Sequence, residues 1–108
     1  MTDSILYTIK DYLGASRDDA SFDSSILMTL NSVIGFLVQI GIGTAGFIVT
    51  SEKETWVDLY SNESNIPYMK MYVCLKTKLI FDPPTNATLL KSMEELIKEA
   101  EWRLNINT

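Results

Sequence analysis

Two adjacent prolines, Pro83 and Pro84, impose the strongest constraint on how this chain folds. They remove two backbone N–H donors and exclude the residue before them from the α region, so a preceding helix has to end near Phe81. Thr85 or Asn86 can then cap a second helix through its side-chain oxygen. The sequence therefore predicts two helices joined by a rigid corner.

The segment after this corner has the pattern of an amphipathic helix. The face opposite its apolar residues carries pairs of oppositely charged side chains four residues apart, such as Glu99 and Arg103. Such pairs are typical of a solvated helix surface. The apolar residues recur at about 3.6 residues per turn and are Leu89, Leu90, Met93, Leu96, Ile97, Ala100 and Leu104.

Trp102 lies almost opposite the centre of that apolar face, between Lys91, Lys98 and Glu95. A tryptophan on a polar face has two interpretations. It packs beneath another part of its own chain, as most large aromatic residues do, or it anchors a partner protein, since tryptophan is enriched at interface hot spots.

Two further helices are predicted in the N-terminal half. Asp3 or Ser4 caps the first, and Gly14 fits its C-terminal position. After a polar loop, Asp23 is expected to cap a longer helix that runs to about Ile40. The spaced glycines that follow resemble a phosphate-binding loop only superficially, because they close a helix and do not open one.

The segment near residues 46–60 permits two predictions. Residues 47–50 are suited to an extended piece, and Ser51 with Glu54 matches a capping box that would start a short helix over residues 52–60. A hairpin strand is the alternative. Pro67 fits the first turn of the next helix. The predicted fold class is therefore mainly α, a small bundle of roughly four to five helices with a short extended or hairpin segment near residues 46–60, in one domain over residues 1–108.

No charged residue occurs between Asp23 and Glu52, an interval long enough to cross a bilayer of ~30 Å. Polar residues such as Asn31 and Gln39 interrupt it, and its apolar residues are periodic. We therefore favour a buried helix, with a membrane span as the alternative.

The composition excludes several chemistries. The chain has no histidine and a single cysteine, Cys74, so it cannot assemble the usual zinc ligand sets or a Ser-His-Asp site, and no disulfide can form within one chain. Cys74 lies in an apolar helical run and is expected to be a small buried hydrophobe. Asp18, Asp19 and Asp23 lack the glycine and distal glutamate of a calcium loop. We expect neither an enzyme nor a bound metal or cofactor.

The net charge of −5 and the absence of a Lys/Arg cluster argue against a module that grips nucleic acid. No secretory signal is visible, so a cytoplasmic origin is expected.

Several segments resemble one known family over nearly the whole chain. They are residues 3–14, residues 18–34, Glu54-Thr55-Trp56, residues 72–76, the Phe81-Asp82-Pro83-Pro84 corner and the terminal Glu101-Trp102-Arg103-Leu104-Asn105. Together they look like the head–tail connector (adaptor) proteins of tailed phages and prophages. The corner and the terminal helix are specific as a pair.

This resemblance implies a structural virion protein of the neck that assembles as a ring of about twelve subunits under the portal. Such a protein extends the DNA channel, lets DNA pass without specific binding, and docks the next head-closure or tail completion protein. Its partners would be further copies of itself, the portal protein and that completion protein, with no membrane involved.

Candidate interface residues follow from the need for two different faces on each subunit of a ring. Trp56, Tyr60 and Trp102 are the aromatic candidates, and Arg103, Asn105 and Ile106 extend the last one toward the polar tail over residues 105–108. We expect Trp102 and this tail to contact the portal or the adjacent subunit. Two rival hypotheses are a small phage membrane protein of the lysis type and a generic helical protein-binding module.

Overall fold

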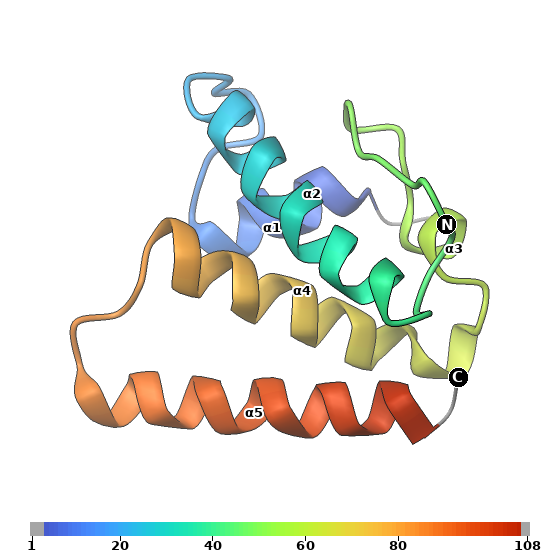
Figure 1. Ribbon diagram of the computed structural model, residues 1–108. Helices are drawn as coiled ribbons and strands as arrows, with labels where there is room; N and C mark the ends of the chain where they lie inside the picture. Colours follow the sequence, from blue (N-terminus) through green and yellow to red (C-terminus); the bar gives the residue numbers. More distant parts are fainter. Residues whose placement is uncertain (1–3, 107–108) are drawn as a thin grey trace.

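The computed structural model describes residues 4–106 and confirms the predicted mainly α fold. The helices are α1 (Ile5–Leu13), α2 (Asp23–Gln39), α3 (Trp56–Leu59), α4 (Ile66–Phe81) and α5 (Ala87–Ile106), with a short 3-10 helix, η1 (Glu63–Asn65), before α4. Figure 1 shows α5 running alongside α4, while α1 and α2 lie on the other side of α4. Within residues 4–106 there is no strand, only one isolated antiparallel bridge between Ser4 and Thr55.

The ends of α1 are set by the predicted residues. The Ser4 side chain accepts a hydrogen bond from the Tyr7 N–H at 3.2 Å, which satisfies one donor of the first turn. Gly14 closes the helix with a φ of 80°, a left-handed conformation that glycine adopts without steric cost.

The loop between α1 and α2 is held by a buried lysine. The side chain of Lys10 is 1% exposed, and its Nζ donates to the Arg17 carbonyl at 3.2 Å and the Asp19 carbonyl at 2.8 Å. It also donates to Asp23 Oδ1 at 2.7 Å. The prediction that Asp23 caps α2 is therefore wrong. Phe22 occupies the cap position, and the Asp23 carboxylate in the first turn pairs with Lys10.

In the part of the chain that the structure describes, the segment after α2 forms no strand, so the hairpin alternative is not found. Its backbone is instead fixed by a side chain of α2. The Asn31 Nδ2 donates to the Val49 carbonyl at 2.9 Å, and the Val49 N–H donates to Asn31 Oδ1 at 2.8 Å. The amide of Asn31 thus provides the donor and the acceptor that a neighbouring strand would otherwise supply.

The short helix α3 begins four residues later than predicted. Its capping box consists of Thr55 and Asp58, whose side chains each accept a hydrogen bond from the other's backbone N–H. Ser51 and Glu54 do interact, with the Ser51 N–H donating to Glu54 Oε1 at 3.1 Å, but this pair stabilises a turn and does not start a helix. The indole of Trp56 donates to Thr8 Oγ1 at 3.1 Å and so attaches α3 to α1.

The corner between α4 and α5 agrees with the prediction. Pro67 lies in the first turn of α4, which ends at Phe81, and Asn86 Oδ1 accepts a hydrogen bond from the Leu89 N–H at 3.0 Å. The helix α4 is central, because α1, α2, α3 and α5 all pack against it. Its buried residues are Met69, Tyr72, Val73, Cys74, Leu75 and Thr77.

The buried face of α5 is narrower than its apolar pattern suggests. Met93, Ile97, Ala100 and Leu104 are buried, at steps of three and four residues. Leu89 and Leu96 belong to the predicted apolar face but are exposed. Because α5 packs mainly on a single helix, only the central part of its apolar face is covered.

Candidate protein-interaction surfaces

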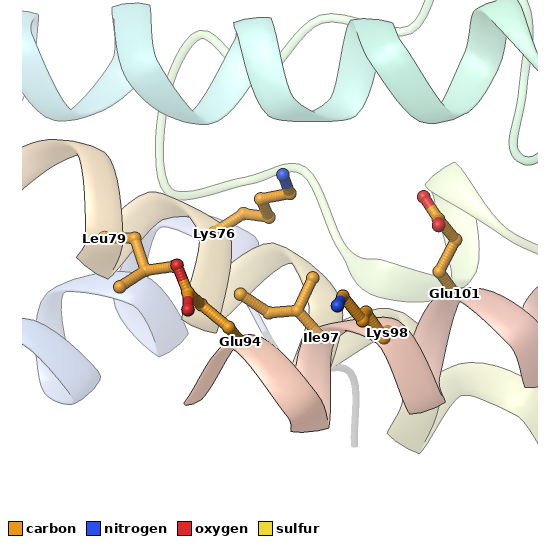
Figure 2. Close-up of a pocket in the computed structure, with 6 residues that line it drawn as sticks. All are labelled: Lys76, Leu79, Glu94, Ile97, Lys98 and Glu101. Atoms are coloured by element: carbon orange, nitrogen blue, oxygen red, sulfur yellow. The ribbon is translucent and has the colours of Figure 1, made fainter. Parts of the chain in front are cut away.

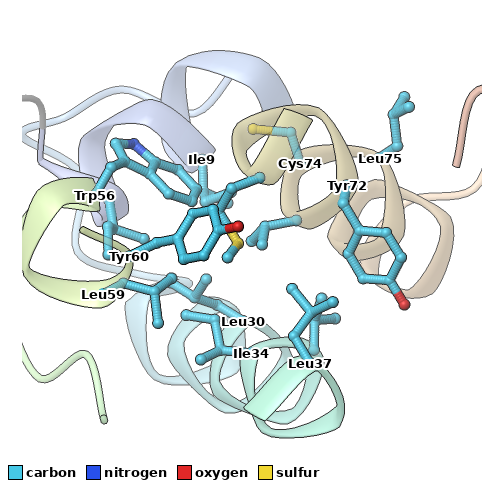
Figure 3. Close-up of a cluster of buried hydrophobic side chains, with 14 of the residues drawn as sticks. Ile9, Leu30, Ile34, Leu37, Trp56, Leu59, Tyr60, Tyr72, Cys74 and Leu75 are labelled. Atoms are coloured by element: carbon cyan, nitrogen blue, oxygen red, sulfur yellow. The ribbon is translucent and has the colours of Figure 1, made fainter. Parts of the chain in front are cut away.

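Trp56 and Tyr60 lie inside the molecule. Figure 3 shows both rings in the buried cluster with Ile9 and Leu30. Trp56 is 1% exposed, because the capping box of α3 and the hydrogen bond to Thr8 direct its indole inward. Neither ring lies on the surface, so the expected docking face at these residues has no support in the folded chain.

Trp102 is 56% exposed, on the outer side of α5. Within residues 4–106 no other segment covers this side chain, so packing beneath its own chain finds no support there, and the role of a partner anchor stays a prediction. Arg103 is held in place beside it: its Nε donates to Glu99 Oε2 at 2.7 Å, and its guanidinium lies 5.4 Å from the centre of the Tyr68 ring. Asn105 and Ile106 are also exposed. The last two residues of the predicted tail, 107 and 108, lie outside the described residues.

A hollow with charged walls lies between α2, α4 and α5. Figure 2 shows Lys76 of α4 and Glu101 of α5 projecting toward α2, with Glu94 and Lys98 farther along α5. One part of this hollow has a volume of 420 Å³; an adjoining part of 340 Å³ shares Lys76 and Glu101. The Lys76 ammonium lies 5.9 Å from the centre of the Tyr72 ring. We call this surface the charged hollow.

An apolar groove lies between α1, α4 and α5. It has a volume of 370 Å³ and is lined by Tyr12, Pro67, Lys70, Met71, Cys74, Leu75 and Leu96. Burial raises the pKa of the Cys74 thiol to about 12, so the thiol stays protonated and behaves as the small hydrophobe that the sequence predicts. Burial also raises the pKa of Tyr12. We call this surface the apolar groove.

The outer face of α2 is a third apolar surface, which the sequence analysis did not identify. Met28 and Phe36 of α2, and Ile40 directly after its last residue, are between 54 and 73% exposed. They follow one another at multiples of four residues, with Ser32 between the first two, so the signal was present in the sequence. It was missed because the periodicity of α2 was used to identify only the buried face. We call these three residues the α2 ridge.

Neither a metal cluster nor a membrane span is found in residues 4–106. No group of three or more Cys, Asp or Glu side chains there has the arrangement of a metal site, and Asp23 of the acidic loop is already paired with Lys10. None of the described helices combines the length and the apolar character needed to cross a bilayer.

In a comparison with known families, the model of the phage connector protein family matches residues 5–108. No curated protein and no solved structure matches the chain. The matched range includes every helix of the fold, the proline corner and the exposed end of α5. This chain therefore belongs to the phage connector protein family and has the general role of a phage head–tail connector.

Proposed function

We propose that this protein assembles as a ring of about twelve subunits beneath the portal, extends the DNA channel and docks the next head-closure or tail completion protein. The observation that carries the proposal is the family match over almost the entire chain. The protein would enter the virion neck after synthesis in the host cytoplasm. Its role is structural, and we propose no catalytic activity.

The surfaces of the monomer support a ring of this kind. A ring of identical subunits in a head-to-tail arrangement requires two different surfaces on each subunit, so that each copy contacts the next in the same way. The α2 ridge and the apolar groove are two such surfaces. Together they leave more apolar area exposed than isolated surface side chains would.

The exposed end of α5 supports contact with a different protein. Trp102 and Ile106 are exposed, and Arg103 is fixed by Glu99 and Tyr68. An aromatic anchor beside an ordered arginine is a common composition for the centre of a protein interface. We propose that Trp102, Arg103, Asn105 and Ile106 contact the portal.

The charge of the chain suits a channel through which DNA slides. Nine basic residues oppose fourteen acidic ones, and Lys10 is buried in a hydrogen-bonded network. Tight binding to DNA requires several basic side chains that neutralise neighbouring phosphates. With an acidic balance, contact with the DNA backbone would be weak, and the DNA would pass without specific binding.

Electron microscopy of the protein mixed with its portal tests this proposal directly. The expected result is a ring of density added to one end of the portal, coaxial with its channel. A lysate of a phage with an early stop codon in this gene should then contain heads beside separate, complete tails. Portals without added density, or joined virions in that lysate, would contradict the connector role.

A further inference from the structure

The outer face of α2 is exposed and uncharged. No charged residue occurs between Asp23 and Glu52, although helix faces in water usually carry charge. Gly35, within this helix, has no atom within 4 Å of the position its Cβ would occupy, so packing in the monomer does not require a glycine. A glycine in a helix interior costs about 1 kcal/mol relative to alanine. The close approach of another molecule to α2 would account for a glycine at this position.

The α2 ridge and the apolar groove lie on different sides of the central helix α4. Phe36 and Ile40 border the charged hollow together with Tyr72 and Lys76 of α4, whereas the apolar groove uses Met71 and its neighbours. At 3.6 residues per turn, the α4 residues that border the charged hollow and those that line the apolar groove are roughly 140° apart around the helix axis. One copy of the chain can therefore present its ridge to one neighbour and its groove to another.

We propose that the α2 ridge of one copy inserts into the apolar groove of the next copy. This inference rests on the proposed ring and names the surfaces that join its subunits. Every subunit would contribute its ridge once and its groove once, which is the heterologous arrangement that closes into a ring.

The chemistry of the two surfaces favours this pairing over the alternative. The charged hollow contains two lysines and two glutamates, and an uncharged helix face laid over it would desolvate these charges without giving them partners. The apolar groove has one charged residue, Lys70, among six that are largely apolar. The ridge therefore matches the groove in polarity.

The exposed area is large enough for a specific interface. The groove residues Tyr12, Met71 and Leu96 are between 37 and 45% exposed. With the three ridge residues they offer six side chains, each exposing on the order of 100 Å², or about 600 Å² in all. A standard interface buries about 1,600 Å², of which somewhat more than half is apolar, so these six residues would supply most of its apolar core.

Two aspartate variants test the inference. Phe36→Asp alters the ridge and Leu96→Asp alters the groove, and both side chains are exposed in the monomer, so circular dichroism should show folded protein. We expect each variant to lose ring formation on the portal by at least tenfold in electron micrographs. Val57→Asp is the matched control, because Val57 is apolar and about as exposed as Leu96 but lies on α3 outside both surfaces, and its rings should equal those of the wild type.

Cysteine cross-linking gives a second test that does not depend on the aspartate variants folding. In a Cys74→Ala background, which removes the free thiol that lines the groove, the double variant Phe36→Cys/Leu96→Cys should form a ladder of linked subunits when its rings are oxidised, whereas each single variant in that background should not. If the wild type forms rings on the portal, two results would overturn this inference and leave the connector role standing. One is intact rings from both aspartate variants, and the other is a double cysteine variant that does not link. A wild-type protein that adds no ring to the portal would overturn both.

Discussion

Lys10 Nζ lies 2.7 Å from Asp23 Oδ1, and this ion pair joins the end of α1 to the start of α2. The same ammonium donates to two carbonyl groups of the intervening loop, so all three of its donors are used. A buried lysine is tolerated only when its charge is compensated in this way. The pair therefore determines how the loop returns the chain to α2.

Replacement of Lys10 should destabilise the fold strongly. Lys10→Met keeps the apolar stem but leaves the Asp23 carboxylate and two carbonyl groups without their donor, and we expect a loss of about 3 kcal/mol in the free energy of unfolding. Urea denaturation followed by circular dichroism measures it. The control is Arg17→Met, which removes the solvent-exposed pair with Asp11 and should have a much smaller effect. Equal effects of the two variants would contradict the role assigned to Lys10.

Asn31→Ala should loosen the segment after α2. It removes both hydrogen bonds to the buried Val49 backbone, and an unsatisfied buried backbone group costs roughly 1–3 kcal/mol. We expect a loss of about 2 kcal/mol in stability and faster amide exchange at Val49. Gln39→Ala, on the exposed side of the same helix, should change neither quantity. Unchanged exchange at Val49 in the Asn31 variant would show that other contacts hold the segment.

Tyr60→Phe should stabilise the protein. The Tyr60 hydroxyl is buried and has no hydrogen-bond partner in the part of the chain that the structure describes. Removing an unsatisfied buried hydroxyl while keeping the ring should raise the free energy of unfolding by about 1 kcal/mol. Thermal unfolding measures the change, and Tyr12→Phe at an exposed position should leave the midpoint unchanged. A lower midpoint for the Tyr60 variant would indicate that its hydroxyl has a partner, such as a bound water.

The Cys74 thiol should make stability depend on pH on the alkaline side. Burial raises its pKa from 9.0 to about 12, so the unfolded chain loses this proton before the folded one does. The contribution of this protonated thiol to the free energy of unfolding is fully present below pH 9.0, and it is lost as the pH rises from 9.0 toward 12. Cys74→Ala should reduce the fall in stability over this interval. At pH 8 the native thiol should react with iodoacetamide at least 100-fold more slowly than in urea; equal rates would show that Cys74 is accessible.

The parts of the fold that the sequence predicts are those set by neighbouring residues. Pro83 and Pro84 end α4 and Asn86 starts α5 through contacts within a few positions, so local chemistry was sufficient. The start of α3 was different. Both Ser51 with Glu54 and Thr55 with Asp58 fit a capping box. The structure uses the Thr55–Asp58 pair, which goes together with the contact between Trp56 and Thr8, two residues that are distant in sequence.

The interaction surfaces were also harder to predict, because they too depend on contacts between residues that are distant in sequence. An aromatic residue in a sequence does not reveal which side of its helix is covered, so Trp56 and Trp102 were equivalent candidates before the packing was known. The buried network of Lys10 was missed because its partners lie in a loop without periodicity. Helical patterns identify a face, but only the tertiary contacts decide whether that face is buried.

Trp102→Ala should weaken binding to the portal without affecting the fold. The side chain is exposed, so its removal leaves no cavity, and the free energy of unfolding should be unchanged. A tryptophan anchor contributes about 2 kcal/mol or more, which corresponds to roughly 30-fold weaker binding. Surface plasmon resonance on immobilised portal measures this affinity. Leu89→Ala, at an exposed position near the other end of α5, serves as the matched control and should bind like the wild type. Wild-type affinity for the Trp102 variant would place the portal contact elsewhere on the molecule, while the ring contact through the α2 ridge would be unaffected by that result.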